Sequence, residues 1–204
     1  MPIIKRKGEK RKMIREFEIH SNLVQRKGWK DLVQHMEEIG YFIAPASTSH
    51  HSALPEGLVR HSCKVTDIML TTSKGLYPAL SEESIRIVGL CHDLGKAGYY
   101  GVPYYEDNIL KSGKRSDSKP YECNDKLLAI PHETSSLHIV SKFIQLTQEE
   151  AYAILYHNGL YTPAGSVTKG NERPLQQLIH FADMYESRFG NMRYEEKQYV
   201  GGMF

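Results

Sequence analysis

The sequence predicts an all-α fold, and three observations support this prediction. Apolar residues recur at spacings of three and four along most of the chain. Residues that favour helix starts and ends bracket these stretches. No segment alternates apolar and polar residues for more than about five positions, as a half-buried strand would. The 204 residues, 40% apolar and 25% charged, fit one globular domain and exclude a collagen-like or largely disordered chain.

Three helices are expected in the first half of the chain. Residues 29–39 place their apolar side chains on one face, and Gly40 ends this helix. A second helix is expected over residues 56–73. A third begins near Ser81, a favourable N-cap residue, and ends at Gly95. Because this third helix is apolar nearly all round, we expect it to be central and buried.

The second half combines a long loop with three further helices. Residues 98–131 lack helical periodicity, and an irregular loop of that length is usually functional or mobile. Helices are expected over residues 133–145 and 148–157, the second opened by a capping box that starts at Thr147. Pro174 suits the first position of the last helix.

The N-terminus is strongly basic. We expect residues 1–20 to form a basic leader and the start of the first helix, and residues 21–204 to form a single helical domain. Six of the first twelve residues are Lys or Arg, against one Glu. Such a tail either contacts nucleic acid or phosphate, or is a solvated leader that aids solubility. No aromatic residue is interleaved with these charges, which disfavours nucleic acid.

The sequence also bears on location. The longest apolar run, residues 41–46, is far shorter than the ~20 residues that span a bilayer, so we expect no membrane association. No apolar stretch follows the basic residues, so a secretory signal is not expected. Cys63, Cys91 and Cys123 are odd in number and form no Cys-x-x-Cys pair. This argues against a disulfide scaffold or a thiolate zinc site and favours the cytoplasm.

Polar residues lie on the apolar faces of three predicted helices. His61, the pair His92-Asp93, and Asp183 are the clearest cases. A single buried histidine is usually a hydrogen-bonded core residue, and an aspartate at a helix edge is usually solvated. The four together are most simply explained if they bind one cation. Glu186 falls near the middle of the last apolar stripe, where it would orient a metal ligand or, with the helix rotated, face solvent.

The order of these residues resembles the HD-domain family of metal-dependent phosphohydrolases, which is defined by His…His-Asp…Asp. The resemblance covers about residues 54–190 and extends to a small bacterial and phage-type subgroup. Two further histidines of the two-metal members have counterparts in Pro131-His132-Glu133 and in Tyr156-His157-Asn158-Gly159. The matching core motifs are the stretch 55–62 around His61, CHDLGK at 91–96 and HFAD at 180–183.

The resemblance implies an HD-type helical bundle with a divalent metal centre. The expected metal ligands are His61, His92, Asp93, His132, His157 and Asp183, with Asp93 as the bridge between two ions. Imidazoles and carboxylates without a thiolate favour one or two ions of Mn²⁺, Fe²⁺, Co²⁺ or Mg²⁺. Asp93 and Lys96 are the expected catalytic residues, and Lys96 would contact phosphate as a compact charge. The alternative for Lys96 is a solvated lysine at a helix end.

The loop over residues 98–131 supplies the expected substrate contacts. Aromatic faces can stack a nucleobase while cations meet phosphates. The expected substrate-binding residues are Lys96, Tyr99, Tyr100, Lys111, Lys114 and Arg115. Tyrosines packed in the core and a solvated loop explain the same residues equally well. Glu133 and Glu186 are expected to orient metal ligands.

The expected function is therefore that of a metal-dependent phosphohydrolase. It would cleave a phosphoester or phosphoanhydride bond, most simply in a nucleotide, with a metal-activated water. One alternative is an HD-type nuclease on RNA or single-stranded DNA, with the basic tail along the nucleic-acid backbone. Another is a non-catalytic nucleotide-binding module. Fold and metal ligands do not determine the substrate.

Overall fold

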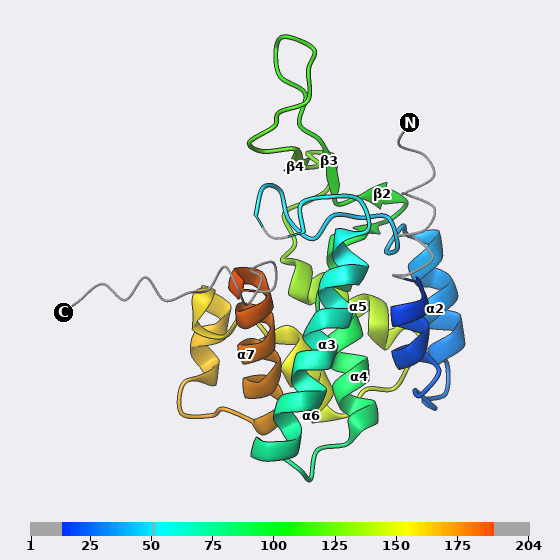
Figure 1. Ribbon diagram of the computed structural model, residues 1–204, viewed down its shortest axis with the longest axis vertical. Coiled ribbons are helices and arrows are strands. Elements are labelled where there is room, and N and C mark those ends of the chain that lie inside the picture. Colours follow the sequence, from blue (N-terminus) through cyan, green and yellow to red (C-terminus); the bar gives the residue numbers. More distant parts are fainter. Residues whose placement is uncertain (1–13, 51, 190–204) are drawn as a thin grey trace, which may run out of the picture.

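The computed structural model of the chain describes residues 14–50 and 52–189 and is mostly helical (Figure 1). A first helix covers residues 14–21. It is followed by α2 (Trp29–Glu38), α3 (Gly57–Leu76), α4 (Glu82–Cys91), α5 (His132–Ser141), α6 (Gln148–Leu155) and α7 (Pro174–Phe189). Short 3₁₀ turns are η1 (Leu94–Lys96), η2 (Gly159–Tyr161) and η3 (Pro163–Thr168). Within the described ranges, no helix is both long and apolar enough to cross a bilayer.

Helix α4 is central, as its apolar sequence indicates. All residues from Ile85 to Cys91 are buried, and α4 packs against α3, α6 and α7. In turn, α3 packs against α7, and α5 packs against η1 and α6. The largest fully buried side chains of this core include Leu58, Met69 and Leu90. The hydrophobic core therefore surrounds α4, with the other helices around it.

The helix-start signals in the sequence are confirmed. Ser81 is the N-cap of α4, and its hydroxyl accepts a hydrogen bond from the Ser84 N–H. Thr147 and Glu150 form a reciprocal capping box at the start of α6. Pro174 is the first residue of α7, where its missing N–H and fixed φ cost nothing.

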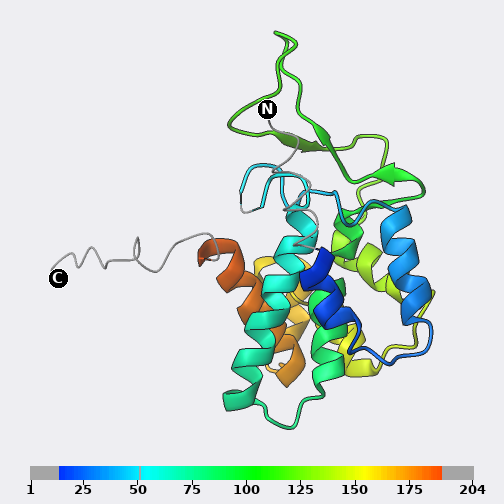
Figure 2. The same ribbon diagram turned by 45° about the vertical axis from the view of Figure 1, so that its right-hand side comes forward.

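The segment over residues 98–131 differs from the irregular loop expected. It contains two antiparallel hairpins, in which β1 (Gly98–Tyr99) pairs with β2 (Val102–Pro103), and β3 (Tyr105–Asp107) pairs with β4 (Tyr121–Cys123). Strands of two or three residues are too short to show the alternation that predicts a strand. The hairpins rise from one end of the helical bundle, and the loop between β3 and β4 extends farthest (Figures 1 and 2).

The helix over residues 14–21 contributes to the core. Phe17 is 2% exposed, and its ring centroid lies 5.9 Å from that of Tyr41 and 4.9 Å from that of Phe42. Farther along, the Arg26 guanidinium forms two hydrogen bonds, of 3.0 and 2.8 Å, with the buried carboxylate of Glu150 on α6. The basic residues expected to act as a leader, residues 5–12, lie outside the described residues.

Candidate metal centre

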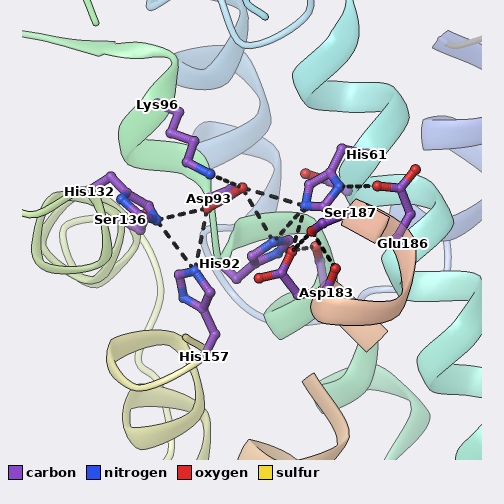
Figure 3. Close-up of polar contacts among 12 residues, drawn as sticks. His61, His92, Asp93, Lys96, His132, Ser136, His157, Asp183, Glu186 and Ser187 are labelled. Atoms are coloured by element: carbon purple, nitrogen blue, oxygen red, sulfur yellow. Dashed lines mark hydrogen bonds and ion pairs between the residues drawn. The ribbon is translucent and has the colours of Figure 1, made fainter. Parts of the chain in front are cut away.

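Six side chains from separate elements converge at the end of the bundle that carries the hairpins (Figure 3). They are His61 on α3, His92 at the end of α4, Asp93 directly after it, His132 at the start of α5, His157 after α6, and Asp183 on α7. These are all the residues that the sequence singles out as metal ligands. The structure thus brings together side chains that lie up to 122 positions apart in the chain.

The first half of the cluster is formed by His61, His92 and Asp183. The Nε2 atoms of His61 and His92 are 3.3 Å apart, and His61 Nε2 lies 3.1 Å from Asp183 Oδ1. One donor atom from each of the three residues falls within 4.8 Å of the others. A cation between these atoms would have ligands on three sides.

The second half is formed by His132 and His157 around Asp93. Asp93 Oδ1 lies 3.1 Å from His132 Nε2 and 3.5 Å from His157 Nε2, and these two nitrogens are 3.4 Å apart. Asp93 Oδ2 faces the other way, 3.5 Å from His61 Nε2 and 3.6 Å from His92 Nε2. The two oxygens of one carboxylate therefore face the two halves of the cluster, which is the arrangement of a bridging ligand.

Three of the histidines are held with Nε2 toward the cluster. His92 Nδ1 donates to the carbonyl of Gly89 at 2.9 Å, and His157 Nδ1 donates to a carbonyl of α6 at 2.8 Å. His61 Nδ1 lies 2.5 Å from a carboxylate oxygen of Glu186, which is itself buried. Because a neutral imidazole carries one proton, a donating Nδ1 leaves the lone pair on Nε2, which in His92 and His157 points toward the cluster.

The cluster attracts positive charge. Burial on its own would lower the pKa of His61, but hydrogen bonds with Asp183 and Glu186 outweigh it and raise that pKa to about 10. Burial would likewise raise the pKa of Asp93, yet Lys96 and the surrounding imidazoles hold it well below its usual value. His92 shows the opposite balance, because burial lowers its pKa to about 3 and keeps its ring neutral. The carboxylates around His61 therefore favour a positive charge at the cluster.

The donor set and its spacing fit a divalent cation. Octahedral ligands at about 2.1 Å from an ion stand about 3 Å from each other, close to the distances of 3.1–3.6 Å in the cluster. Asp93 Oδ1 is buried and, among the described residues, accepts no hydrogen bond. Cys91 is not among the residues whose donor atoms group together here. The buried cluster could therefore hold a metal ion with nitrogen and oxygen ligands.

The centre is open on one side. The side chains of His61, His92, Asp93 and His157 are at most 1% exposed. Those of Lys96, Asp183 and His132 are 15%, 16% and 18% exposed. A structural metal site is usually closed by protein ligands, whereas a catalytic site keeps a position that water or substrate can reach.

Further side chains orient the ligands. Lys96 Nζ lies 2.7 Å from Asp93 Oδ2, and the Ser187 hydroxyl donates to the carbonyl of Asp183 at 2.6 Å. Glu133 accepts a hydrogen bond from Asn158 at 2.6 Å, and its other oxygen lies 3.4 Å from His132 Nδ1. Glu133 and Glu186 thus contact one metal-ligand candidate each.

Gly95 allows η1 to approach α5 closely. A Cβ at this position would lie 2.4 Å from the carbonyl oxygen of His132 and 2.8 Å from the Ser135 Cβ. The Gly95 N–H donates to the Ser136 hydroxyl at 2.8 Å, and this bond is buried. The absence of a side chain at Gly95 therefore determines where His132 stands relative to Asp93.

Tyr105 belongs to the tyrosines of the 98–131 segment that could stack a nucleobase, but it is not among the expected substrate-binding residues. Burial raises the pKa of this β3 phenol, while Lys96 opposes the shift and Asp93 adds to it, which places the phenol within electrostatic reach of both groups. No periodicity marks Tyr105, because it lies on a three-residue strand. Asn158 was also missed as a polar contact, although it directly follows His157 and both belong to one motif.

The structure does not bring the other expected substrate-binding residues to the cluster. Tyr100 is 82% exposed, and the Tyr99 ring packs against Tyr100 and His138 and lies under the Lys142 ammonium. Lys111, Lys114 and Arg115 lie exposed in the loop between β3 and β4, where Arg115 pairs with Asp107 and covers the Tyr121 ring. The loop between β3 and β4, which carries Lys111, Lys114 and Arg115, extends away from the helical bundle (Figure 2).

The chain matches no protein-family model, no curated protein and no solved structure.

Proposed function

We propose that this protein is a metal-dependent phosphohydrolase of the HD type, acting on a phosphoester or phosphoanhydride bond, most simply in a nucleotide. The observation that carries the proposal is the convergence of six nitrogen- and oxygen-bearing side chains around the two-sided carboxylate of Asp93. The order of these residues in the chain, His…His-Asp…His…His…Asp, supports the family assignment.

The open side of the centre favours catalysis over a structural metal site. Lys96, His132 and Asp183 are reachable from solvent, while the remaining ligands are buried. A non-catalytic binding module would not need a partly exposed lysine against the bridging carboxylate. This combination of cation and open ligand positions suits an anionic substrate such as a phosphate ester.

The chain's own residues would have distinct tasks. His61, His92, Asp93 and Asp183 would hold one ion, and His132 and His157 would hold a second that shares Asp93. When bound, such ions polarise a phosphoryl oxygen and lower the pKa of a coordinated water. Asp93 orients Lys96 through their 2.7 Å contact, and the Lys96 ammonium would bind a phosphate oxygen from the same side. Glu186 and the carbonyls behind His92 and His157 keep the imidazoles turned toward the centre.

The test combines metal binding with substrate identification. Purified protein is titrated with Mn²⁺, and the loaded protein is assayed on ribonucleotides, deoxyribonucleotides, cyclic dinucleotides and short oligonucleotides, with the released phosphate species identified. We expect turnover that is lost in Asp93→Asn and His92→Gln. The matched control is His35→Gln, which alters a half-buried imidazole on α2 that also has a glutamate neighbour. A folded wild type that binds no metal and turns over no phosphate ester would refute the proposal.

The same panel separates the alternatives. Turnover of RNA or single-stranded DNA without turnover of mononucleotides would identify a nuclease instead. Tight nucleotide binding to the Mn²⁺-loaded protein without any hydrolysis would identify a binding module.

A further inference from the structure

A small pocket adjoins the metal centre on the side of Asp183. Lys96, by contrast, contacts Asp93. Its volume is about 140 Å³. At about 30 Å³ for each water, it has room for a group the size of a tetrahedral phosphate. Its polar lining comes from the turn after α6, η2 and the end of α7, and consists of Asn158, Tyr161, His180, Asp183, Ser187 and Arg188.

Arg188 is the cation of this pocket. Its guanidinium carbon lies 5.7 Å from the centroid of the Tyr161 ring, and this aromatic face supports the planar group. Over residues 14–50 and 52–189, no carboxylate forms an ion pair with Arg188. By contrast, Arg173 at the other end of α7 pairs with Glu149, and Lys96 pairs with Asp93. Among the residues that the structure describes, no carboxylate therefore competes with an outside anion for the guanidinium beside the metal centre.

The other polar groups of the pocket leave Arg188 as its main donor. His180 Nδ1 donates to the carbonyl of His157 at 2.9 Å, and the Ser187 hydroxyl donates to the carbonyl of Asp183. One N–H of Asn158 is used by Glu133. An anion in the pocket would thus depend mainly on the fork of Arg188, whose geometry matches two phosphate oxygens at once.

We propose that this pocket is a phosphate subsite, in which Arg188 binds a phosphate group of the substrate next to Asp183. The inference rests on the proposed function and adds to it a specificity-determining residue. Together with Lys96 at the Asp93 side, Arg188 places a cation on each side of the metal centre. The substrate is accordingly one whose phosphate oxygens reach both the metal centre and the end of α7.

Binding of inorganic phosphate to the Mn²⁺-loaded full chain, measured by calorimetry, tests the subsite without any need for turnover. We expect Arg188→Gln to weaken phosphate binding about tenfold or more, because it removes a charge-assisted pair of hydrogen bonds. Arg188→Lys keeps the charge but loses the forked guanidinium, so its phosphate affinity should lie between those of Arg188→Gln and the wild type. Arg173→Gln, an exposed arginine before α7 that pairs with Glu149, should bind phosphate as the wild type does. The Mn²⁺ stoichiometry and thermal unfolding of Arg188→Gln should match the wild type, since Arg188 is exposed.

The outcomes separate this inference from the proposed function. Phosphate binding that depends on Arg188, in a protein that hydrolyses nothing in the panel, supports the subsite and refutes the phosphohydrolase. Mn²⁺-dependent hydrolysis with the same KM and the same phosphate affinity in Arg188→Gln as in the wild type supports the phosphohydrolase and overturns the subsite. An increase of about tenfold in KM with an unchanged number of bound ions supports both.

Discussion

The close approach of η1 to α5 at Gly95 can be tested with a single methyl group. In Gly95→Ala the new Cβ would stand 2.4 Å from the His132 carbonyl oxygen and 2.8 Å from the Ser135 Cβ. Ordinary van der Waals contact begins at 3.4 Å, so the start of α5 must retreat by about 1 Å. Overpacking of this kind costs about 1–3 kcal/mol of the free energy of unfolding.

The same displacement should impair the metal centre. His132 Nε2 lies 3.1 Å from Asp93 Oδ1 in the wild type. A shift of about 1 Å at the start of α5 would change the distances from this imidazole to Asp93 and His157 by a similar amount. Misplacement on this scale can lower activity by about 100-fold. We therefore expect Gly95→Ala to lose Mn²⁺ affinity as well as stability.

Urea denaturation and Mn²⁺ titration of the variant measure the two effects. The matched control is Gly75→Ala, at the end of α3, where an added Cβ has no heavy atom within 4 Å. This control should gain up to about 1 kcal/mol, because alanine favours the helix more than glycine does. If Gly95→Ala unfolds within about 0.5 kcal/mol of the wild type and binds Mn²⁺ equally well, the proposed role of the glycine is refuted.

Three further substitutions probe the centre and the core. Glu186→Gln should weaken Mn²⁺ binding about 10- to 100-fold, because the buried carboxylate orients His61; an affinity within twofold of the wild type in a calorimetric titration would contradict this. Glu150→Gln should cost about 2 kcal/mol at pH 7, because it removes the charged partner of Arg26. Burial opposes ionisation of Glu150, but Arg26 holds its pKa below the usual 4.5, so the charge stabilises the fold above that pH. The deficit of the variant in urea denaturation should therefore shrink as the pH falls below about 4.5, and a constant deficit would contradict it. Tyr41→Phe should cost about 1 kcal/mol in thermal unfolding, because a buried hydroxyl donates to a carbonyl of α4 at 2.9 Å, and an unchanged midpoint would show that this bond contributes nothing.

The sequence was most informative where a signal is local. The N-cap Ser81, the capping box at Thr147 and the first-turn Pro174 each depend on residues within one helical turn, so they could be recognised before any tertiary contact was known. His61 and Asp183 could be found by periodicity, because each shares a face with apolar residues.

Other features depend on contacts that periodicity does not carry. His132 starts a helix and His157 follows one, so neither lies on an apolar stripe, and only the family resemblance pointed to them. The two hairpins have strands of two or three residues and leave no alternating pattern. The position of Tyr105 near Lys96 follows from the path of the second hairpin and could not be predicted from spacing alone.

The attachment of the N-terminal helix limits how far the chain can be shortened for expression or crystallisation. A version beginning at α2 would lack the Phe17 ring that fills space beside Tyr41 and Phe42. It would also leave the carboxylate of Glu150 buried on α6 without the guanidinium of Arg26. Trimming should therefore stop before residue 14, and affinity tags are best joined ahead of that point, where they add to the chain without removing these contacts.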